Sequence, residues 1–100
     1  MQVTYKKAFA QFVKKVSKPF QLAIEIRVNE VRSNPRIGQQ KLGDLHGVFV
    51  YKFRFNAQEY LMAYQFDNFE GEEKITWIEF CKVGPHENFY AQLKKSIRFE

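Results

Sequence analysis

The spacing of apolar residues changes along the chain from a helical period to a strand period. Between residues 5 and 31, apolar side chains recur every three or four positions, which is typical of amphipathic helices. From residue 48 to residue 83 they alternate with polar residues or occupy both faces, which is typical of β-strands. Residues 86–97 return to the helical period. The pattern therefore predicts helices packed on a sheet rather than an all-helical or all-strand fold.

Two helices are predicted in the N-terminal part of the chain. The first covers residues 6–16 and ends before Pro19, because proline suits the first turn of a following helix. The second runs over residues 19–32 and stops before Pro35, since the residue preceding a proline avoids the helical conformation. Together they form a helical hairpin. Residues 36–47, which contain three glycines, are predicted to be a loop.

The C-terminal part predicts three strands and a closing helix. The strands cover residues 48–55, 59–67 and 74–83, and they are joined by a turn at 56–58 and a polar loop at 68–73. Gly84-Pro85 ends the third strand, residues 86–97 form the last helix, and residues 2–4 form a short edge strand. The predicted fold class is α+β. Its single domain, residues 1–100, packs an N-terminal helical hairpin on a small antiparallel β-sheet with a C-terminal helix.

The charge is positive and unevenly distributed. Sixteen Lys and Arg oppose 11 Asp and Glu, and residues 1–41 alone carry nine basic residues against Glu25 and Glu30. A basic surface favours a polyanion or an acidic protein as partner. The simpler interpretation is a solvated helical face. We expect an RNA-binding surface formed by Lys6, Lys7, Lys14, Lys15 and Arg36.

Several classes of protein are excluded or disfavoured. The single Cys81 excludes an internal disulfide framework and fits a reducing cytosol, so a cytoplasmic location is expected. No glycine-rich phosphate loop or nucleophile elbow is present. His46 and His86 are too isolated to predict a metal site, and neither a metal nor another cofactor is expected. No apolar run approaches 18 residues and no signal peptide is recognisable, so no membrane association is expected.

One polar cluster remains as candidate chemistry. Lys52 and Arg54 are two positions apart on a predicted strand, so their side chains project from the same face. His86 opens the predicted last helix and Tyr90 follows one turn later. If the first and third predicted strands are near neighbours, these four side chains line one cleft. Two cations, an imidazole and a phenol suit metal-free cleavage of RNA, whose 2′-hydroxyl supplies the nucleophile. We therefore predict a catalytic set of Lys52, Arg54, His86 and Tyr90.

A purely structural role for the same residues stays open at this point. Lys52 and Arg54 would then be solvated cations on an open sheet face. His86 would only cap a helix, and Tyr90 would only pack against the sheet.

Short motifs in a fixed order give the chain a family resemblance. They are Ser33 to Arg36 (SNPR), Leu42 to Gly47 (LGDLHG), Val50 to Phe55 (VYKFRF), Glu59 to Tyr64 (EYLMAY) and Gly84 to Tyr90 (GPHENFY). With this order and spacing the chain resembles the RelE/ParE superfamily of bacterial type II toxins. The resemblance covers nearly the whole chain, and the α+β fold expected for that superfamily matches the predicted order of elements.

The resemblance implies a toxin that a cognate acidic antitoxin protein neutralises. Members with RNase activity enter the ribosomal A site and cut mRNA by 2′-hydroxyl attack, while basic residues hold ribosomal RNA. In such members the strand that corresponds to residues 51–55 carries cations, which matches Lys52 and Arg54. The histidine and aromatic four positions apart, His86 and Tyr90, resemble the YafQ-like branch. The expected partners are therefore the antitoxin, the ribosome and mRNA.

One position departs from the RNase pattern. Many RNase members have arginine directly after the tyrosine that matches Tyr60, and this chain has Leu61. Arg54 takes over that role, or the activity is weak, or the chain follows the ParE branch, which inhibits DNA gyrase. An inactive member that only binds its antitoxin is a further alternative. Because a gyrase inhibitor would not need His86 and Tyr90, we expect a ribosome-dependent mRNA endoribonuclease (mRNA interferase).

Overall fold

The computed structural model describes residues 1–67 and 74–99. Its three helices are α1 (Lys7–Lys15), α2 (Lys18–Ser33) and α3 (Phe89–Phe99). Its five strands are β1 (Gln2–Tyr5), β2 (Gln39–Gln40), β3 (Phe49–Phe55), β4 (Gln58–Phe66) and β5 (Trp77–Pro85). Short 3-10 turns, η1 (Pro35–Ile37) and η2 (Gly43–Leu45), lie in the segment predicted to be a loop. The predicted loop at 68–73 lies outside the described residues.

The five strands form one sheet in the order β1-β5-β4-β3-β2. Neighbouring strands from β2 to β5 are antiparallel, as predicted, whereas β1 pairs with β5 in parallel. The sheet is therefore mixed rather than purely antiparallel. The parallel pair arises because the chain leaves β1 through α1 and α2 and returns to β5 only after β3 and β4, a crossover long enough to restore the original direction.

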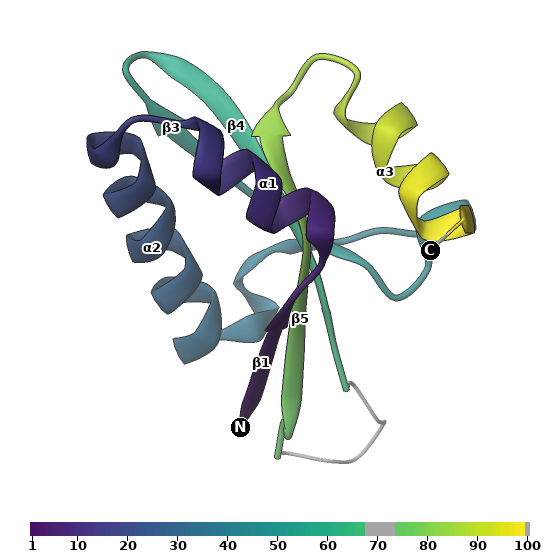
Figure 1. Ribbon diagram of the computed structural model, residues 1–100. Helices are drawn as coiled ribbons and strands as arrows, with labels where there is room; N and C mark the ends of the chain where they lie inside the picture. Colours follow the sequence, from purple (N-terminus) through teal and green to yellow (C-terminus); the bar gives the residue numbers. More distant parts are fainter. Residues whose placement is uncertain (68–73, 100) are drawn as a thin grey trace.

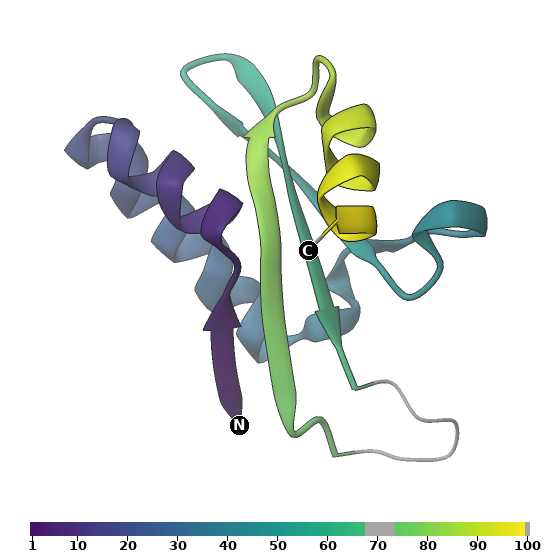
Figure 2. The ribbon, with the colours of Figure 1, turned by 45° about the vertical axis from the view of Figure 1, so that its right-hand side comes forward.

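The helices cover opposite faces of this sheet, as Figures 1 and 2 show: α1 and α2 lie on one face and α3 on the other. The hairpin face buries a large aromatic core that includes Phe9, Phe20, Tyr64 and Phe80. The α3 face buries a smaller core that includes Leu61, Phe89 and Leu93. The alternating strands thus place one set of side chains under the helical hairpin and the other under α3.

Local sequence signals explain most of the turns. Ser17 caps α2 by accepting a hydrogen bond from the Phe20 amide at 3.4 Å, and Pro19 lies in the first turn. Asn56 and Ala57, with φ of 50° and 64°, form the tight turn between β3 and β4. Asn88 has φ of 60°, so the chain cannot be helical there, and α3 begins at Phe89 instead of His86. The prediction that His86 opens the helix is wrong.

The segment after α2 is fixed by one buried phenol. The Tyr64 hydroxyl donates to the Pro35 carbonyl at 2.6 Å and accepts from the Gly38 amide at 2.9 Å. Burial raises the pKa of Tyr64 to about 12, so the hydroxyl stays protonated and remains a donor at neutral pH. A Cβ at Gly38 would lie 2.6 Å from that hydroxyl and 3.0 Å from the Val50 carbonyl oxygen. The close approach of this backbone to the sheet therefore requires glycine.

Replacing Gly38 with alanine should lower the free energy of unfolding by about 1–3 kcal/mol, because the added methyl group displaces a hydrogen-bonded phenol in a packed core. Urea unfolding measures the change. Gly84→Ala is the matched control, since the nearest heavy atom to its Cβ would be a Phe12 ring carbon at an ordinary 3.8 Å. Equal stability of Gly38→Ala and the unsubstituted protein would show that the segment is not fixed by this contact.

A buried carboxylate closes the far end of the β4–β5 pair. Asp67 accepts hydrogen bonds from the Thr76 amide at 2.9 Å, the Thr76 hydroxyl at 2.5 Å and the Trp77 amide at 3.1 Å. The hydrogen bond from the Thr76 hydroxyl is the main cause that holds the pKa of Asp67 below its ordinary value of 3.8. The ionised carboxylate therefore stabilises the native state.

Because the folded-state pKa of Asp67 is depressed, its stabilisation is complete above pH 3.8 and is lost as pH falls through the folded-state pKa. We expect Asp67→Asn to be less stable than the unsubstituted protein at neutral pH. Its melting temperature should also fall less than that of the unsubstituted protein when the pH is lowered. Thermal melts between about pH 6 and pH 2 measure both effects. Asp44→Asn, at an exposed position in η2, is the control. Parallel melting curves for Asp67→Asn and the unsubstituted protein would contradict the assignment.

Candidate functional site

A shallow pocket of about 320 Å³ opens on the α3 face of the sheet, beside β2 and β3. Lys52 from β3, Leu61 from β4 and Tyr90 from α3 line it together with the backbone around Gly38. Lys52 and Leu61 are directly opposite each other in the β3–β4 pair, so their side chains emerge from the same face. The structure thus brings two of the predicted catalytic residues, Lys52 and Tyr90, to one pocket.

The ammonium group of Lys52 is available to a ligand. Its side chain is 65% exposed, and its nitrogen lies 3.9 Å from an oxygen of Glu59. A pair this long and this exposed contributes little and is easily exchanged for another anion. Lys52 can therefore leave Glu59 and bind a phosphate.

His86 and Tyr90 meet although they do not share a helical turn. His86 lies in the turn between β5 and α3, where its carbonyl accepts a hydrogen bond from the Phe89 amide at 3.2 Å. The His86 and Tyr90 rings face each other edge to face, with centroids 6.2 Å apart. The imidazole is solvent-exposed, whereas Tyr90 is half-buried against the sheet. The pair therefore presents a proton-transfer group beside an aromatic surface.

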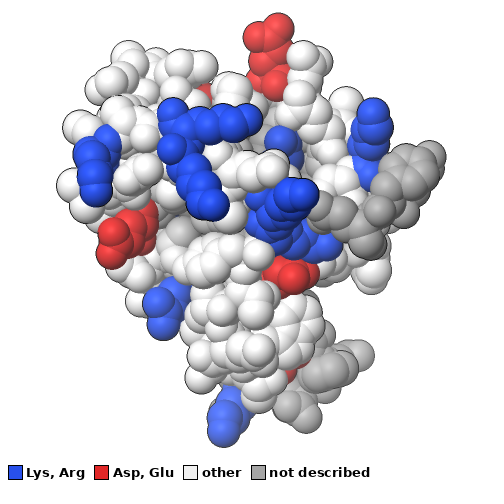
Figure 3. All heavy atoms as spheres, in the orientation of Figure 1, with Lys and Arg blue, Asp and Glu red and all other residues white. Residues whose placement is uncertain are grey.

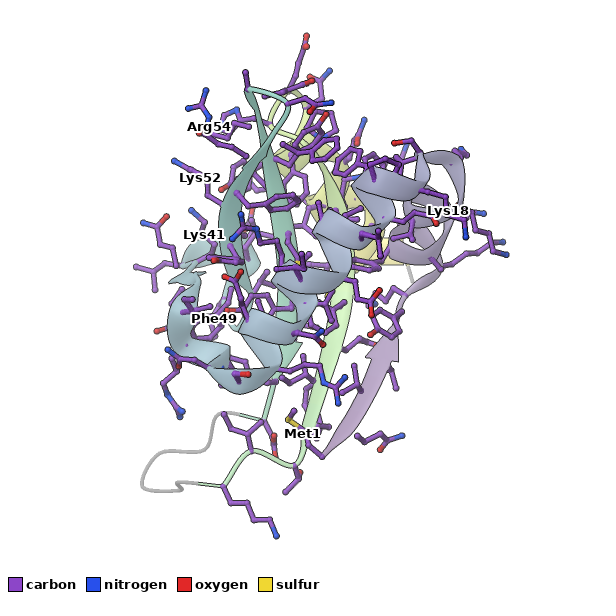
Figure 4. All side chains as sticks on the ribbon, turned by 90° about the vertical axis from the view of Figure 1, so that its left-hand side faces the viewer. Met1, Lys18, Lys41, Phe49, Lys52 and Arg54 are labelled. Carbon is purple, nitrogen blue, oxygen red and sulfur yellow. The ribbon has the colours of Figure 1, made fainter. Side chains whose placement is uncertain are left out.

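Arg54 lies apart from the pocket. Its guanidinium Nη2 donates to the Ala57 carbonyl at 3.1 Å and is directed toward the β3–β4 turn. In Figure 4, Arg54, Lys52 and Lys41 project in that order along the same side of the molecule, which is the outer edge of the sheet. The predicted near-neighbour arrangement of β3 and β5 is only approximate, since β4 lies between them and separates their axes by about 10 Å.

Lys41 contacts Tyr90, one of the residues that line the pocket, and it was not predicted as a site residue. Its ammonium group lies 5.0 Å from the centre of the Tyr90 ring, which is a cation–π distance, and 2.9 Å from the side-chain oxygen of Gln39. The Lys41 amide donates to the Val48 carbonyl at 2.9 Å, which returns the loop to the sheet. No periodic pattern reveals such a contact, because it depends on how an irregular segment folds back.

Lys82 is a second basic residue on this face that the sequence pattern did not single out. A β-bulge opposite Ala63 and Tyr64 leaves Cys81 as the extra residue and turns Lys82 toward α3. Its ammonium group lies 5.7 Å from the centre of the Phe89 ring, and burial lowers the pKa of Lys82. Strict alternation along β5 would place Lys82 on the side of Ile78 and Phe80, under the helical hairpin.

Leu61, at the position where many RNase members carry arginine, is 1% exposed and belongs to the core under α3. Its side chain forms part of the pocket wall and supplies no charge. Arg54 does not occupy this place, because its guanidinium group is directed toward the turn between β3 and β4, where it bonds to the Ala57 carbonyl. Lys41 is the cation that stands next to Tyr90 instead.

The predicted RNA-binding lysines lie on the opposite face of the sheet. Lys7, Lys14 and Lys15 are exposed on α1, and Lys6 precedes that helix and is half-buried. Figure 3 shows Lys and Arg side chains gathered over the upper part of the face that α1 covers. Arg36 packs over the Phe66 ring at 5.6 Å. The structure therefore does not join this set to the pocket, and their role in RNA binding stays a prediction.

Residues 1–67 and 74–99 contain no group of three or more His, Cys, Asp or Glu placed to hold a metal ion. Cys81 is buried, and its thiol lies 3.7 Å from the Glu79 carbonyl oxygen. None of the described helices has the length and apolar character needed to cross a bilayer.

The fold resembles solved toxin structures from Escherichia coli. The free RelE toxin, in a double arginine-to-alanine mutant, matches with a TM-score of 0.68 at 17% identity, covering 99% of this chain and 97% of that one. The isolated RelE toxin matches with a TM-score of 0.61 at 17% identity, covering 96% and 97%. The intact RelBE toxin–antitoxin complex matches with a TM-score of 0.61 at 17% identity, covering 86% and 96%. These similarities confirm the predicted RelE-like α+β fold.

A comparison with curated proteins finds no match. The family model for the ParE-like toxin of type II bacterial toxin–antitoxin systems matches residues 3–94, which is nearly the whole chain. The motifs, the order of elements and the solved structures agree with that match. The chain therefore belongs to the ParE-like toxin family of type II bacterial toxin–antitoxin systems.

Proposed function

We propose that this toxin is a ribosome-dependent mRNA endoribonuclease that works without a metal. The observation that carries the proposal is the pocket that Lys52 and Tyr90 line together. The Lys41 ammonium group lies over the Tyr90 ring, and the His86 ring lies edge to face with it. Cations, a proton-transfer group and an aromatic surface are the parts that cleavage of single-stranded RNA requires. The pocket is shallow and open, which suits a polymer held mainly by a larger partner such as the ribosome.

In the proposed reaction the 2′-hydroxyl of the RNA loses its proton to solvent as its oxygen attacks the adjacent phosphorus. The bond from phosphorus to the 5′-oxygen breaks, which leaves a 2′,3′-cyclic phosphate on one fragment and a 5′-hydroxyl on the other. Lys52 binds the phosphate and stabilises the negative charge that develops on its oxygens. His86 transfers a proton to the leaving 5′-oxygen. Tyr90 stacks on a base and keeps the strand in place. Lys41 supplies the second positive charge that the missing arginine at position 61 would otherwise provide.

A gyrase inhibitor is the second candidate, and Leu61 is the observation that favours it. Without an arginine there, the pocket has fewer charges for phosphate chemistry. The exposed lysines of α1 also offer a basic surface away from the pocket. Induction of the protein followed by mapping of RNA 5′ ends separates the two. In-frame cuts in translated messages support the ribonuclease, whereas intact mRNA with a DNA-damage response supports the inhibitor.

We also propose that an acidic antitoxin covers the basic N-terminal surface, which includes Lys14 and Lys15. The family assignment and the RelBE complex, whose toxin has the same fold, support a protein partner of this kind. Opposite charges accelerate the encounter of two proteins, and salt screens that attraction. The association rate should therefore fall as salt rises. An association rate independent of salt would place the antitoxin on a different surface.

A further inference from the structure

The proposed reaction gains from a group that accepts a proton as well as from one that donates it. The 2′-hydroxyl of RNA becomes a strong nucleophile as its proton leaves, and a positioned base accelerates that step. In the proposed reaction His86 serves the leaving oxygen, and the ammonium groups of Lys41 and Lys52 are donors without an acceptor atom. A carboxylate close to the bound phosphate would supply the base.

Glu59, near the start of β4, carries a carboxylate on the pocket side of the sheet. It stands two positions before Leu61, so both side chains project from the α3 face. Its Oε2 lies 3.9 Å from the Lys52 Nζ, and its side chain is 35% exposed. Arg54 is directly opposite Glu59 in the β3–β4 pair. A phosphate that exchanges with Glu59 for the Lys52 ammonium group is therefore brought next to this carboxylate.

A second carboxylate, Glu30, is unsuited to the same role because of its contacts. Arg27 donates to one of its oxygens at 2.9 Å, and the Tyr51 hydroxyl donates to the other at 2.5 Å. The Tyr51 ring packs against the core under the helical hairpin, so Glu30 lies on the face of the sheet away from α3. The pair that Glu59 forms with Lys52 is instead long, exposed and easily exchanged.

The register of the sheet places Glu59 and His86 at the same end of the β4–β5 pair. Tyr60 pairs with Pro85, which is the last residue of β5, and Glu59 and His86 are the next residues outward on the two chains. The His86 ring contacts Tyr90 of α3, so it lies on the same face as Glu59. Neighbouring strands are about 4.8 Å apart. Since the attacking and leaving oxygens lie on opposite sides of phosphorus, a base and an acid on adjacent strands can flank one phosphate.

From this juxtaposition we propose that Glu59 is the general base of the cleavage, an inference that rests on the proposed function. The Glu59 carboxylate takes the proton of the 2′-hydroxyl as the 2′-oxygen bonds to phosphorus. The bond from phosphorus to the 5′-oxygen breaks, and His86 gives that oxygen a proton. The products are a 2′,3′-cyclic phosphate and a 5′-hydroxyl. Glu59 then releases its proton to solvent and His86 takes one from solvent, which restores both groups.

Replacing Glu59 with glutamine keeps the size of the side chain and removes the proton acceptor. Single-turnover cleavage on programmed ribosomes should fall by about 10²-fold or more. If Glu59 only neutralises Lys52, the same substitution frees the Lys52 ammonium group and leaves cleavage unchanged or faster. Glu79→Gln is the matched control, because Glu79 pairs with Gln65 toward the far end of the same two strands. It should cleave within about twofold of the unsubstituted protein.

Chemical rescue separates a base from a structural residue. Potassium formate should raise the cleavage rate of Glu59→Ala in proportion to its concentration, and potassium chloride at the same ionic strength should not. Formate should not rescue His86→Ala, which lacks the acid. Cleavage by Glu59→Gln equal to that by Glu79→Gln would overturn the inference while leaving the proposed function intact, and so would a loss of cleavage that formate does not restore. Intact mRNA with the unsubstituted toxin would overturn the proposed function itself, and this inference with it.

Discussion

Replacing His86 with alanine is expected to lower the rate of mRNA cleavage by about 10²–10⁴-fold, the usual contribution of general acid–base catalysis. The exposed imidazole lies edge to face with the Tyr90 ring, and Tyr90 lines the pocket. Binding to ribosomes should survive, because the cations and not the imidazole hold RNA. Single-turnover cleavage and cosedimentation with ribosomes measure the two effects on the same preparation.

His46→Ala is the matched control for this substitution. His46 is also exposed, but it lies in the turn after η2, whereas His86 contacts Tyr90, which lines the pocket. If His86 only shapes the start of α3, His86→Ala would cost about 1 kcal/mol of stability and leave cleavage unchanged. A folded His86→Ala protein that arrests growth at the same dose as the unsubstituted toxin would remove His86 from the mechanism.

Replacing Lys52 with alanine is expected to lower cleavage by about 10²-fold, the loss of roughly 3 kcal/mol from one charge-assisted contact to the phosphate. Lys41→Ala should cost less, about tenfold, because its ammonium is shared with the Tyr90 ring and Gln39. The double variant should be the weakest enzyme of the three. Cleavage rates on programmed ribosomes measure the series.

Lys94→Ala is the charge-matched control, since Lys94 is exposed on α3 and does not line the pocket. It removes the same net charge and should leave cleavage within about twofold of the unsubstituted protein, because an isolated exposed charge contributes little. Cleavage by Lys52→Ala equal to that by Lys94→Ala would show that the pocket does not bind the scissile phosphate.

The order of elements follows from the sequence because hydrophobic period and turn chemistry are local signals. The stripe that includes Phe9 and the alternation around Phe53 each specify which side of an element is buried. The parallel direction of β1 is not local, since it depends on pairing with residues more than 70 positions away. The left-handed Asn88, which delays α3, is likewise a tertiary outcome, because asparagine adopts several conformations in water.

The candidate site was only partly predictable for the same reason. Lys52 lies on a strand and Tyr90 on a helix, so strand alternation and helix spacing indicated the face from which each side chain projects. Lys41 depends on an irregular segment, and Lys82 depends on a bulge that interrupts the alternation. Arg54 lies on the expected face, yet its flexible side chain bonds to the turn at Ala57 instead of the pocket. Spacing indicates the face from which a side chain projects, and contacts decide where its end group lies.

Cleavage of a defined mRNA on purified ribosomes tests the proposed activity most directly. Ribosomes with an empty A site are mixed with the toxin, and primer extension maps the new RNA ends. The account predicts one dominant cut within the A-site codon, present only with ribosomes and nearly lost with His86→Ala. Intact mRNA at every toxin concentration, together with inhibited supercoiling by purified DNA gyrase in a parallel assay, would contradict it.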